Sequence, residues 1–73
     1  MDIKIKIGQR VRELRKSLGI SQEALAYQAE VDRTYVTDVE NGRRNVSVEI
    51  LEKLIVGLEI NFTEFFNVKE FKK

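Results

Sequence analysis

Residues 21–45 read SQEALAYQAEVDRTYVTDVENGRRN, and this segment decides the fold of the chain. Ser21 is a favourable N-cap for one helix, and Asp32 for a second helix that Asn41 and the glycine after it would stop. Only a few residues separate the two helices, and this spacing is typical of a helix-turn-helix. Because the second helix begins with polar side chains, we expect it to enter the major groove of DNA.

Apolar residues at helical spacing predict three further helices around this pair. Gly19 would end the first helix in a left-handed conformation, while Ser47 and Asn61 would cap a fourth helix and a short fifth one. Residues 3–7 alternate apolar and basic side chains like a strand, but they have no partner strand, so we interpret them as a lead-in to the first helix. The residues expected to face inward are Ile7, Val11, Leu14, Leu18, Leu25, Ala29, Val31, Val36, Val39, Val48, Leu51, Leu54, Ile55 and Leu58.

The composition limits the chemistry that the chain can support. It has 73 residues, which suits a single domain, and neither Cys nor His. It therefore has no disulfide, no thiolate ligand and no imidazole base, and we expect no enzyme activity, no metal and no cofactor. So small a domain buries a modest core, and dimerisation is the expected extra source of stability. No apolar run approaches the roughly 20 residues of a membrane span, and no signal peptide is evident. We therefore expect an intracellular protein that does not enter a membrane.

Charge is distributed unevenly along the chain, although the net charge is only +1. Residues 1–20 hold six Lys or Arg against two acids, residues 21–42 one against five, and residues 43–73 six against five. The local net charges are therefore +4, −4 and +1. Since a nucleic-acid binder usually presents a basic face, we expect affinity to depend on Arg33 and on how the fold gathers the flanking cations.

Three side chains of the second helix of the pair are candidate base contacts. Arg33 is the best of them, because a guanidinium can bridge O6 and N7 of guanine. Thr34 and Thr37 can offer a hydroxyl to a base or a methyl group to thymine. The alternative for each is an ordinary solvated side chain, which is how most charged and polar residues occur.

Other polar residues of the segment suit the DNA backbone, whose contacts set register without reading sequence. Gln22 and Tyr35 are placed for phosphate oxygens, although the Tyr35 ring could also pack against the turn. Arg43 and Arg44 lie just past the second helix, where phosphates or an adjacent minor groove are the expected partners. Asp38 is unfavourable near phosphate, so it would accept from cytosine N4 or simply face solvent.

Two stretches of the sequence carry a resemblance to a known family. GQRVRELRKSLGISQEALA and VDRTYVTDVENGRR resemble the Cro/cI-like (Xre-type) helix-turn-helix family over residues 7–66, with the helix-turn-helix at about 21–41. The run DRTY, followed by a hydroxyl residue, a Glu and RN, is similar to the controller proteins of restriction–modification systems. The resemblance implies a compact, all-α, five-helix, phage-repressor-like DNA-binding domain. Residues 67–73 would be a short C-terminal tail, and we expect its last part, Lys69 to Lys73, to be frayed and solvated.

The resemblance also implies a mode of action. Such controllers are cytoplasmic bacterial homodimers that bind pseudo-palindromic operators beside a promoter, activate or repress according to occupancy, and could contact RNA polymerase. Gln22 would bind a phosphate, and Arg44 and Asn45 would lie along the DNA near the operator centre. Arg15 and Glu40 fall where related repressors have an ion pair between the first and third helices.

The last two helices hold more apolar residues than so small a domain can bury. Exposed apolar patches often mark interfaces. We therefore expect a two-fold dimer with Ile50, Phe62 and Phe66 as contributors. The family also contains phage, plasmid and antitoxin-type repressors, which remain an alternative. An alternative of another class is a helical protein-interaction module that shares the fold without binding DNA.

Overall fold

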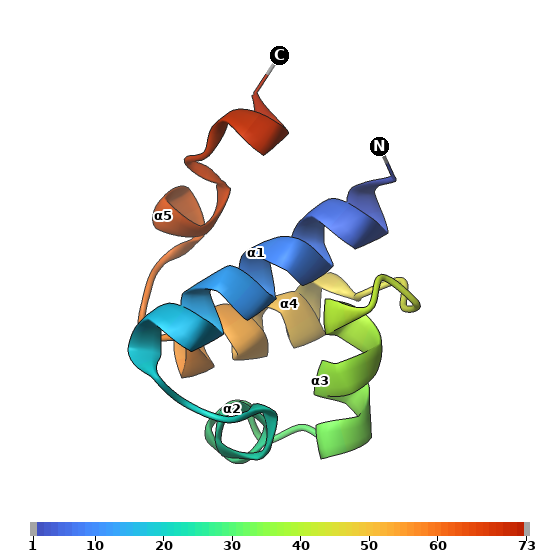
Figure 1. The fold of residues 1–73 in the computed structure, drawn as a ribbon, viewed down its shortest axis with the longest axis vertical. Helices are drawn as coiled ribbons and strands as arrows, with labels where there is room; N and C mark the ends of the chain where they lie inside the picture. Colours follow the sequence, from blue (N-terminus) through green and yellow to red (C-terminus); the bar gives the residue numbers. More distant parts are fainter. Residues whose placement is uncertain (1, 73) are drawn as a thin grey trace.

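A computed structural model describes residues 2–72, and these form helices and connecting turns without a strand (Figure 1). The predicted all-α fold of five helices is confirmed. Figure 1 shows α2 and α3 together at one end of the molecule and the C-terminal segment at the opposite end. The elements are α1 (Ile3–Leu18), α2 (Gln22–Ala29), α3 (Arg33–Glu40), α4 (Val48–Gly57), α5 (Phe62–Phe66) and a 3₁₀ turn η1 (Lys69–Phe71).

The helix ends follow the local chemistry of the sequence. Each predicted N-cap side chain accepts a hydrogen bond from a backbone N–H of the first turn, which satisfies a group that the helix cannot pair itself. Gly19 ends α1 in the left-handed region at φ 72°. The four capping side chains, each with the residue whose N–H donates to it, are Ser21 with Ala24 (3.0 Å), Asp32 with Thr34 (2.8 Å), Ser47 with Ile50 (3.1 Å) and Asn61 with Glu64 (2.8 Å).

The alternating stretch at the N-terminus is helical, so interpreting it as a mere lead-in was wrong. Helix α1 already begins at Ile3, and the Asp2 carboxylate caps it by accepting from the N–H of Lys4 at 2.7 Å. No strand is present among residues 2–72 to pair with this stretch, so its backbone groups bond within the helix. Two of its apolar side chains remain exposed as a result, Ile3 at 56% and Ile5 at 42%.

The core lies where the inward faces of the helices meet, and most of the expected residues contribute to it. Two do not: Leu18 keeps 41% of its surface exposed and Val48 keeps 76%. Both occupy helix ends, Leu18 the last residue of α1 and Val48 the first of α4, where neighbouring helices no longer cover them. The buried hydrophobic residues are Val11, Leu25, Ala26, Ala29, Val36, Val39, Leu51, Leu54, Ile55, Leu58 and Phe65.

Helices α1 and α3 cross at a very short distance, and Gly8 permits it. A Cβ atom at this position would lie 2.2 Å from the carbonyl oxygen of Val39 and 3.0 Å from that of Glu40. The first distance is too short for any side chain and the second is tight, so a larger residue would push the helices apart. The contact fixes α3 against the longest helix of the fold.

The described part of the C-terminal segment is solvated as expected, because Lys69, Glu70 and Lys72 are exposed. The expectation that it is frayed was wrong, since Lys69–Phe71 form η1 and Phe71 packs against the core. The ring of Phe71 meets that of Phe66 edge-on, with centroids 4.9 Å apart, a favourable aromatic geometry. Lys73 of the expected tail lies outside the described residues.

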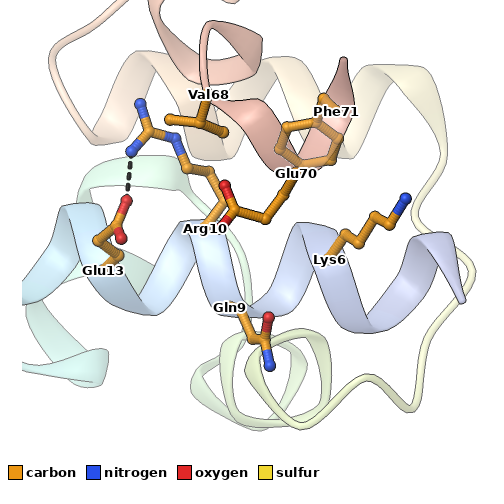
Figure 2. Close-up of a pocket in the computed structure, with 7 residues that line it drawn as sticks. All are labelled: Lys6, Gln9, Arg10, Glu13, Val68, Glu70 and Phe71. Carbon is orange, nitrogen blue, oxygen red and sulfur yellow. Dashed lines mark hydrogen bonds and ion pairs between the residues drawn. The ribbon is translucent and has the colours of Figure 1, made fainter. Parts of the chain in front are cut away.

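Arg10 fastens this end of the molecule to α1, and Figure 2 shows its side chain directed toward the C-terminal segment. Its Nε donates to the carbonyl oxygen of Phe65 at 2.7 Å and its Nη2 to that of Glu64 at 2.8 Å. Its Nη1 also pairs with Glu13. These carbonyls belong to the last turn of α5, where a helix leaves acceptors short of backbone donors. That of Glu64 also accepts from the N–H of Asn67 at 3.4 Å, and Arg10 adds a charged donor to both.

Candidate nucleic-acid interface

The turn between α2 and α3 depends on one strained residue. Glu30 follows α2 in the left-handed conformation, at φ 58° and ψ 42°, where a side chain costs on the order of 1 kcal/mol. The chain then closes with a hydrogen bond of 3.0 Å from the N–H of Val31 to the carbonyl of Ala26. This turn sets the angle at which α3 leaves α2.

The first turn of α3 presents two side chains to solvent. Arg33 and Thr34 are both exposed, and within residues 2–72 neither side chain takes part in a hydrogen bond or an ion pair. A guanidinium and a hydroxyl without internal partners keep their full capacity to bond a ligand. The two residues expected to read bases are therefore exposed together at the start of the helix.

Behind that surface, a buried carboxylate ties α1 to α3. The Glu40 side chain has no exposed surface, and Arg15 donates to it through Nε at 2.6 Å and Nη2 at 3.0 Å. Gln22 adds a bond of 3.1 Å and Arg12 a longer one of 3.3 Å. This is the pair that the resemblance implied between the first and third helices, extended by two further donors.

The surroundings of Glu40 keep it ionised. Burial alone would raise the pKa of Glu40, but hydrogen bonds from Arg15 and its neighbours, together with the Arg15 charge, hold that pKa below its usual value. The bond to Glu40 correspondingly raises the pKa of Arg15. A pair that is charged at neutral pH therefore links α1 to the helix that carries Arg33.

Gln22 and Thr37 belong to this network and not to the freely exposed surface. The Gln22 amide donates to Glu40 through Nε2, and the Thr37 hydroxyl donates to Gln22 Oε1 at 2.8 Å. Both side chains are half-buried. Because an ionised carboxylate only accepts, Glu40 fixes which way the Gln22 amide points, and that orientation positions the Thr37 proton.

Beside the exposed pair, three side chains form a cluster that the sequence did not predict. The Arg44 guanidinium lies 4.4 Å from the centroid of the Tyr35 ring, and its Nε is 3.5 Å from Oδ2 of Asp38. Arg43 and Asn45, on either side of Arg44, are exposed. Tyr35 is half-buried and packs against the core, so its ring serves as a platform for Arg44.

The basic residues of α1 contribute less surface charge than their number indicates. Arg10, Arg12 and Arg15 all bond to other parts of the chain, so half of the six cations in residues 1–20 have internal partners. A count of charges along the sequence cannot detect this, because the partners are backbone carbonyls, an asparagine and a glutamate far along the chain.

The three expected interface residues differ in exposure. Phe62 keeps 40% of its surface exposed, whereas Ile50 and Phe66 are half-buried and pack against the core. Within residues 2–72 there is no group of three side chains able to hold a metal ion, and no helix has the length and apolar character needed to cross a membrane.

Comparison with known proteins agrees with this geometry. A family model described as helix-turn-helix matches residues 11–65. The control protein C.MunI of a Mycoplasma species is 48% identical over 67 residues, which cover 90% of each chain. The control protein C.BamHI of Bacillus amyloliquefaciens is 42% identical over 60 residues, which cover 81% of this chain and 74% of the relative.

Solved structures give the same result. The controller protein C.AhdI of Aeromonas hydrophila superposes with a TM-score of 0.82 at 49% identity, covering 86% of this chain and 96% of its own. The controller C.Esp1396I, solved as a tetramer on its natural 35-base-pair operator, superposes with a TM-score of 0.92 at 33% identity, covering 100% and 99% of the two chains. This chain therefore belongs to the helix-turn-helix family and, within it, to the controller proteins of restriction–modification systems.

Proposed function

We propose that this chain is a sequence-specific DNA-binding regulator that controls transcription of a restriction–modification operon, its own gene included. The observation that carries the proposal is the exposed first turn of α3, where Arg33 and Thr34 lack internal partners while the residues behind them are braced. In a helix-turn-helix, this turn is the part that meets base edges. The membership of the chain among controller proteins supports the operon assignment.

The proposed contacts are of two kinds, contacts to bases and contacts to the DNA backbone. Arg33 would take O6 and N7 of a guanine, and Thr34 would contact a neighbouring base. Phosphates would be bound from both ends of the helix pair, which fixes the register of α3 in the groove. The proposed phosphate and groove contacts are Gln22, Tyr35, Arg43, Arg44 and Asn45, with Thr37 close to the bases.

The proposed active form is a homodimer on a pseudo-palindromic operator. Two copies of α3 would then enter successive major grooves about 34 Å apart. The exposed part of Phe62, with Ile50 and Phe66 beside the core, supports an interface through α4 and α5. Sedimentation should show a dimer at tens of micromolar, and a monomer at that concentration would remove this part of the proposal.

The proposal assigns no catalytic step to the chain and places it in the bacterial cytoplasm, on the nucleoid while bound. A regulator beside a promoter could also contact RNA polymerase. Tyr27, 86% exposed on α2, supports such a contact, since an exposed aromatic ring can anchor a protein partner. In vitro transcription with Tyr27→Ala should then lose activation while operator binding stays unchanged.

A salt titration tests the DNA-binding proposal. Affinity for a random duplex should fall steeply as salt rises, because each phosphate contact releases counterions. Footprinting on the DNA upstream of the gene should then show a protected, two-fold related site. Binding that is absent, or that does not respond to salt, would favour a protein-interaction module instead.

A further inference from the structure

The cluster of Tyr35, Asp38 and Arg44 gives one residue of this chain a role that neither the fold nor the family assigns. Tyr35 and Asp38 are three residues apart in α3, so they share one face of the helix. Arg44 returns to that face from the following loop, with Nε 3.5 Å from Oδ2 of Asp38 and the guanidinium 4.4 Å from the ring centroid. One arginine is thus held by a carboxylate and an aromatic face together.

The backbone directs Arg44 to this place. After α3, Gly42 adopts a left-handed conformation at φ 71°, and the N–H of Arg43 donates to the carbonyl of Asp38 at 2.9 Å. A side chain at Gly42 would also meet Ile5, whose Cγ1 lies 2.9 Å from the position of a Cβ. The loop is therefore fixed in a turn that brings the next residue back over α3.

We propose that Asp38 is a positioning residue that restrains Arg44 and limits its contribution to DNA binding. The inference rests on the proposed function, since it concerns how a DNA contact is presented. The Arg44 side chain is 44% exposed and that of Asp38 is 27% exposed, so both are accessible to solvent and to a ligand. A phosphate that approaches Arg44 meets a guanidinium already paired with a carboxylate, and it must compete with Asp38 or share the cation.

Two other roles for Asp38 make different predictions. If Asp38 only repelled phosphates through its own charge, its effect would not depend on Arg44. If it accepted a hydrogen bond from cytosine N4, its loss would weaken the operator complex. A restraint on Arg44 instead predicts that loss of the carboxylate strengthens binding, and only while Arg44 is present.

A double-mutant cycle on a random duplex separates the three roles. Asp38→Asn keeps the size of the side chain and should raise affinity roughly three- to tenfold, with a salt slope steeper by about 0.9, as one phosphate contact becomes fully available. In an Arg44→Gln background, the same substitution should change affinity less than about twofold. Glu70→Gln is the matched control, because it removes one acid from η1, in the C-terminal segment at the opposite end of the molecule from α3 (Figure 1), and should leave binding unchanged in both backgrounds.

Equal gains from Asp38→Asn in the two backgrounds would overturn the proposal in favour of simple repulsion. A loss of affinity confined to the operator would overturn it in favour of base reading. Failure of the starting protein to bind any duplex in a salt-dependent way would instead remove the proposed function itself. Thermal unfolding of each variant should stay close to that of the starting protein, because the pair of Asp38 and Arg44 is accessible to solvent and such pairs contribute at most about 1 kcal/mol.

Discussion

Two sets of arginines in this small domain have the same chemistry and opposite uses. The set in α1 is half-buried and bonds within the chain, whereas the set in α3 and the loop after it is exposed. The first set consists of Arg10, Arg12 and Arg15, and the second of Arg33, Arg43 and Arg44. The α1 arginines therefore bond within the fold. In the second set, Arg33 and Arg43 are exposed, while Arg44 lies between Asp38 and the ring of Tyr35; the second set is the one proposed to bind DNA.

The difference comes from what the fold places opposite each side chain. Arg15 faces a carboxylate without exposed surface, and Arg10 faces two backbone carbonyls at the end of α5. Arg33 faces solvent at the start of its helix. Charge counted along a sequence thus overestimates the charge available to a ligand, because internal acceptors already bond some of the guanidinium groups.

The largest expected effect comes from removing an arginine of the α1 set. Arg15→Ala leaves Glu40 buried with its strongest partner removed, and this should lower the free energy of unfolding by about 3 kcal/mol. Urea denaturation with linear extrapolation measures it. Arg33→Ala is the matched control and should change the free energy of unfolding by less than about 0.5 kcal/mol. Equal losses in the two variants would contradict the division of roles.

Arg33→Ala, which should hardly change stability, should have a large effect on DNA binding. Arg33→Ala removes the proposed bidentate base contact, so operator affinity should fall by roughly 1–3 kcal/mol and base preference should relax at one position. Competition assays on operator variants with a single base pair changed would measure this. Equal losses on operator and random DNA would show that Arg33 binds only phosphate.

Acid should weaken the ion pair between Arg15 and Glu40. The pKa of Glu40 is lower in the folded chain than in the unfolded one, so its contribution is complete above the unfolded value of about 4.3. Stability from this group is then lost as the pH falls from that value through the folded pKa. Urea unfolding at a series of pH values between neutral and acid conditions should show this loss, and Glu40→Gln should reduce the dependence. An unchanged pH profile in that variant would contradict the assignment.

The smallest effect should come from the turn that joins the two helices. Glu30→Gly relieves the left-handed strain and should raise the free energy of unfolding by about 0.5–1 kcal/mol. DNA affinity should not change, because the conformation of the turn is kept. Thermal denaturation beside a binding assay checks both statements, and a Glu30→Gly variant less stable than the starting protein would be evidence against strain.

Much of this fold is determined by local sequence. The caps Ser21, Asp32 and Ser47 and the left-handed Gly19 were predictable because each acts on residues within one helical turn of itself. The same locality placed Arg33 and Thr34 together at the start of α3. Apolar spacing located most of the core but failed at Leu18 and Val48, because periodicity does not indicate where a helix end loses its cover.

The features that sequence reasoning missed depend on distances across the fold. Arg10 bonds to carbonyls more than fifty positions away in the chain, and no pattern around it indicates those partners. Gly8 is needed because the backbone of α3 passes against it. A glycine within a helical pattern can indicate such a packing constraint, but it does not identify the helix that packs there. The sequence predicts either a solvated or a base-contacting Asp38, because no local pattern indicates that the loop after α3 brings Arg44 back to it.

The salt dependence of DNA binding tests the division between the two sets of arginines most directly. Arg43→Gln and Arg12→Gln each remove one positive charge, from the α3-loop set and the α1 set respectively. The slope of log affinity against log salt should become shallower by about 0.9 for Arg43→Gln and stay unchanged for Arg12→Gln. An equal change of slope in both variants would contradict the account, because it would place the α1 arginines on the DNA.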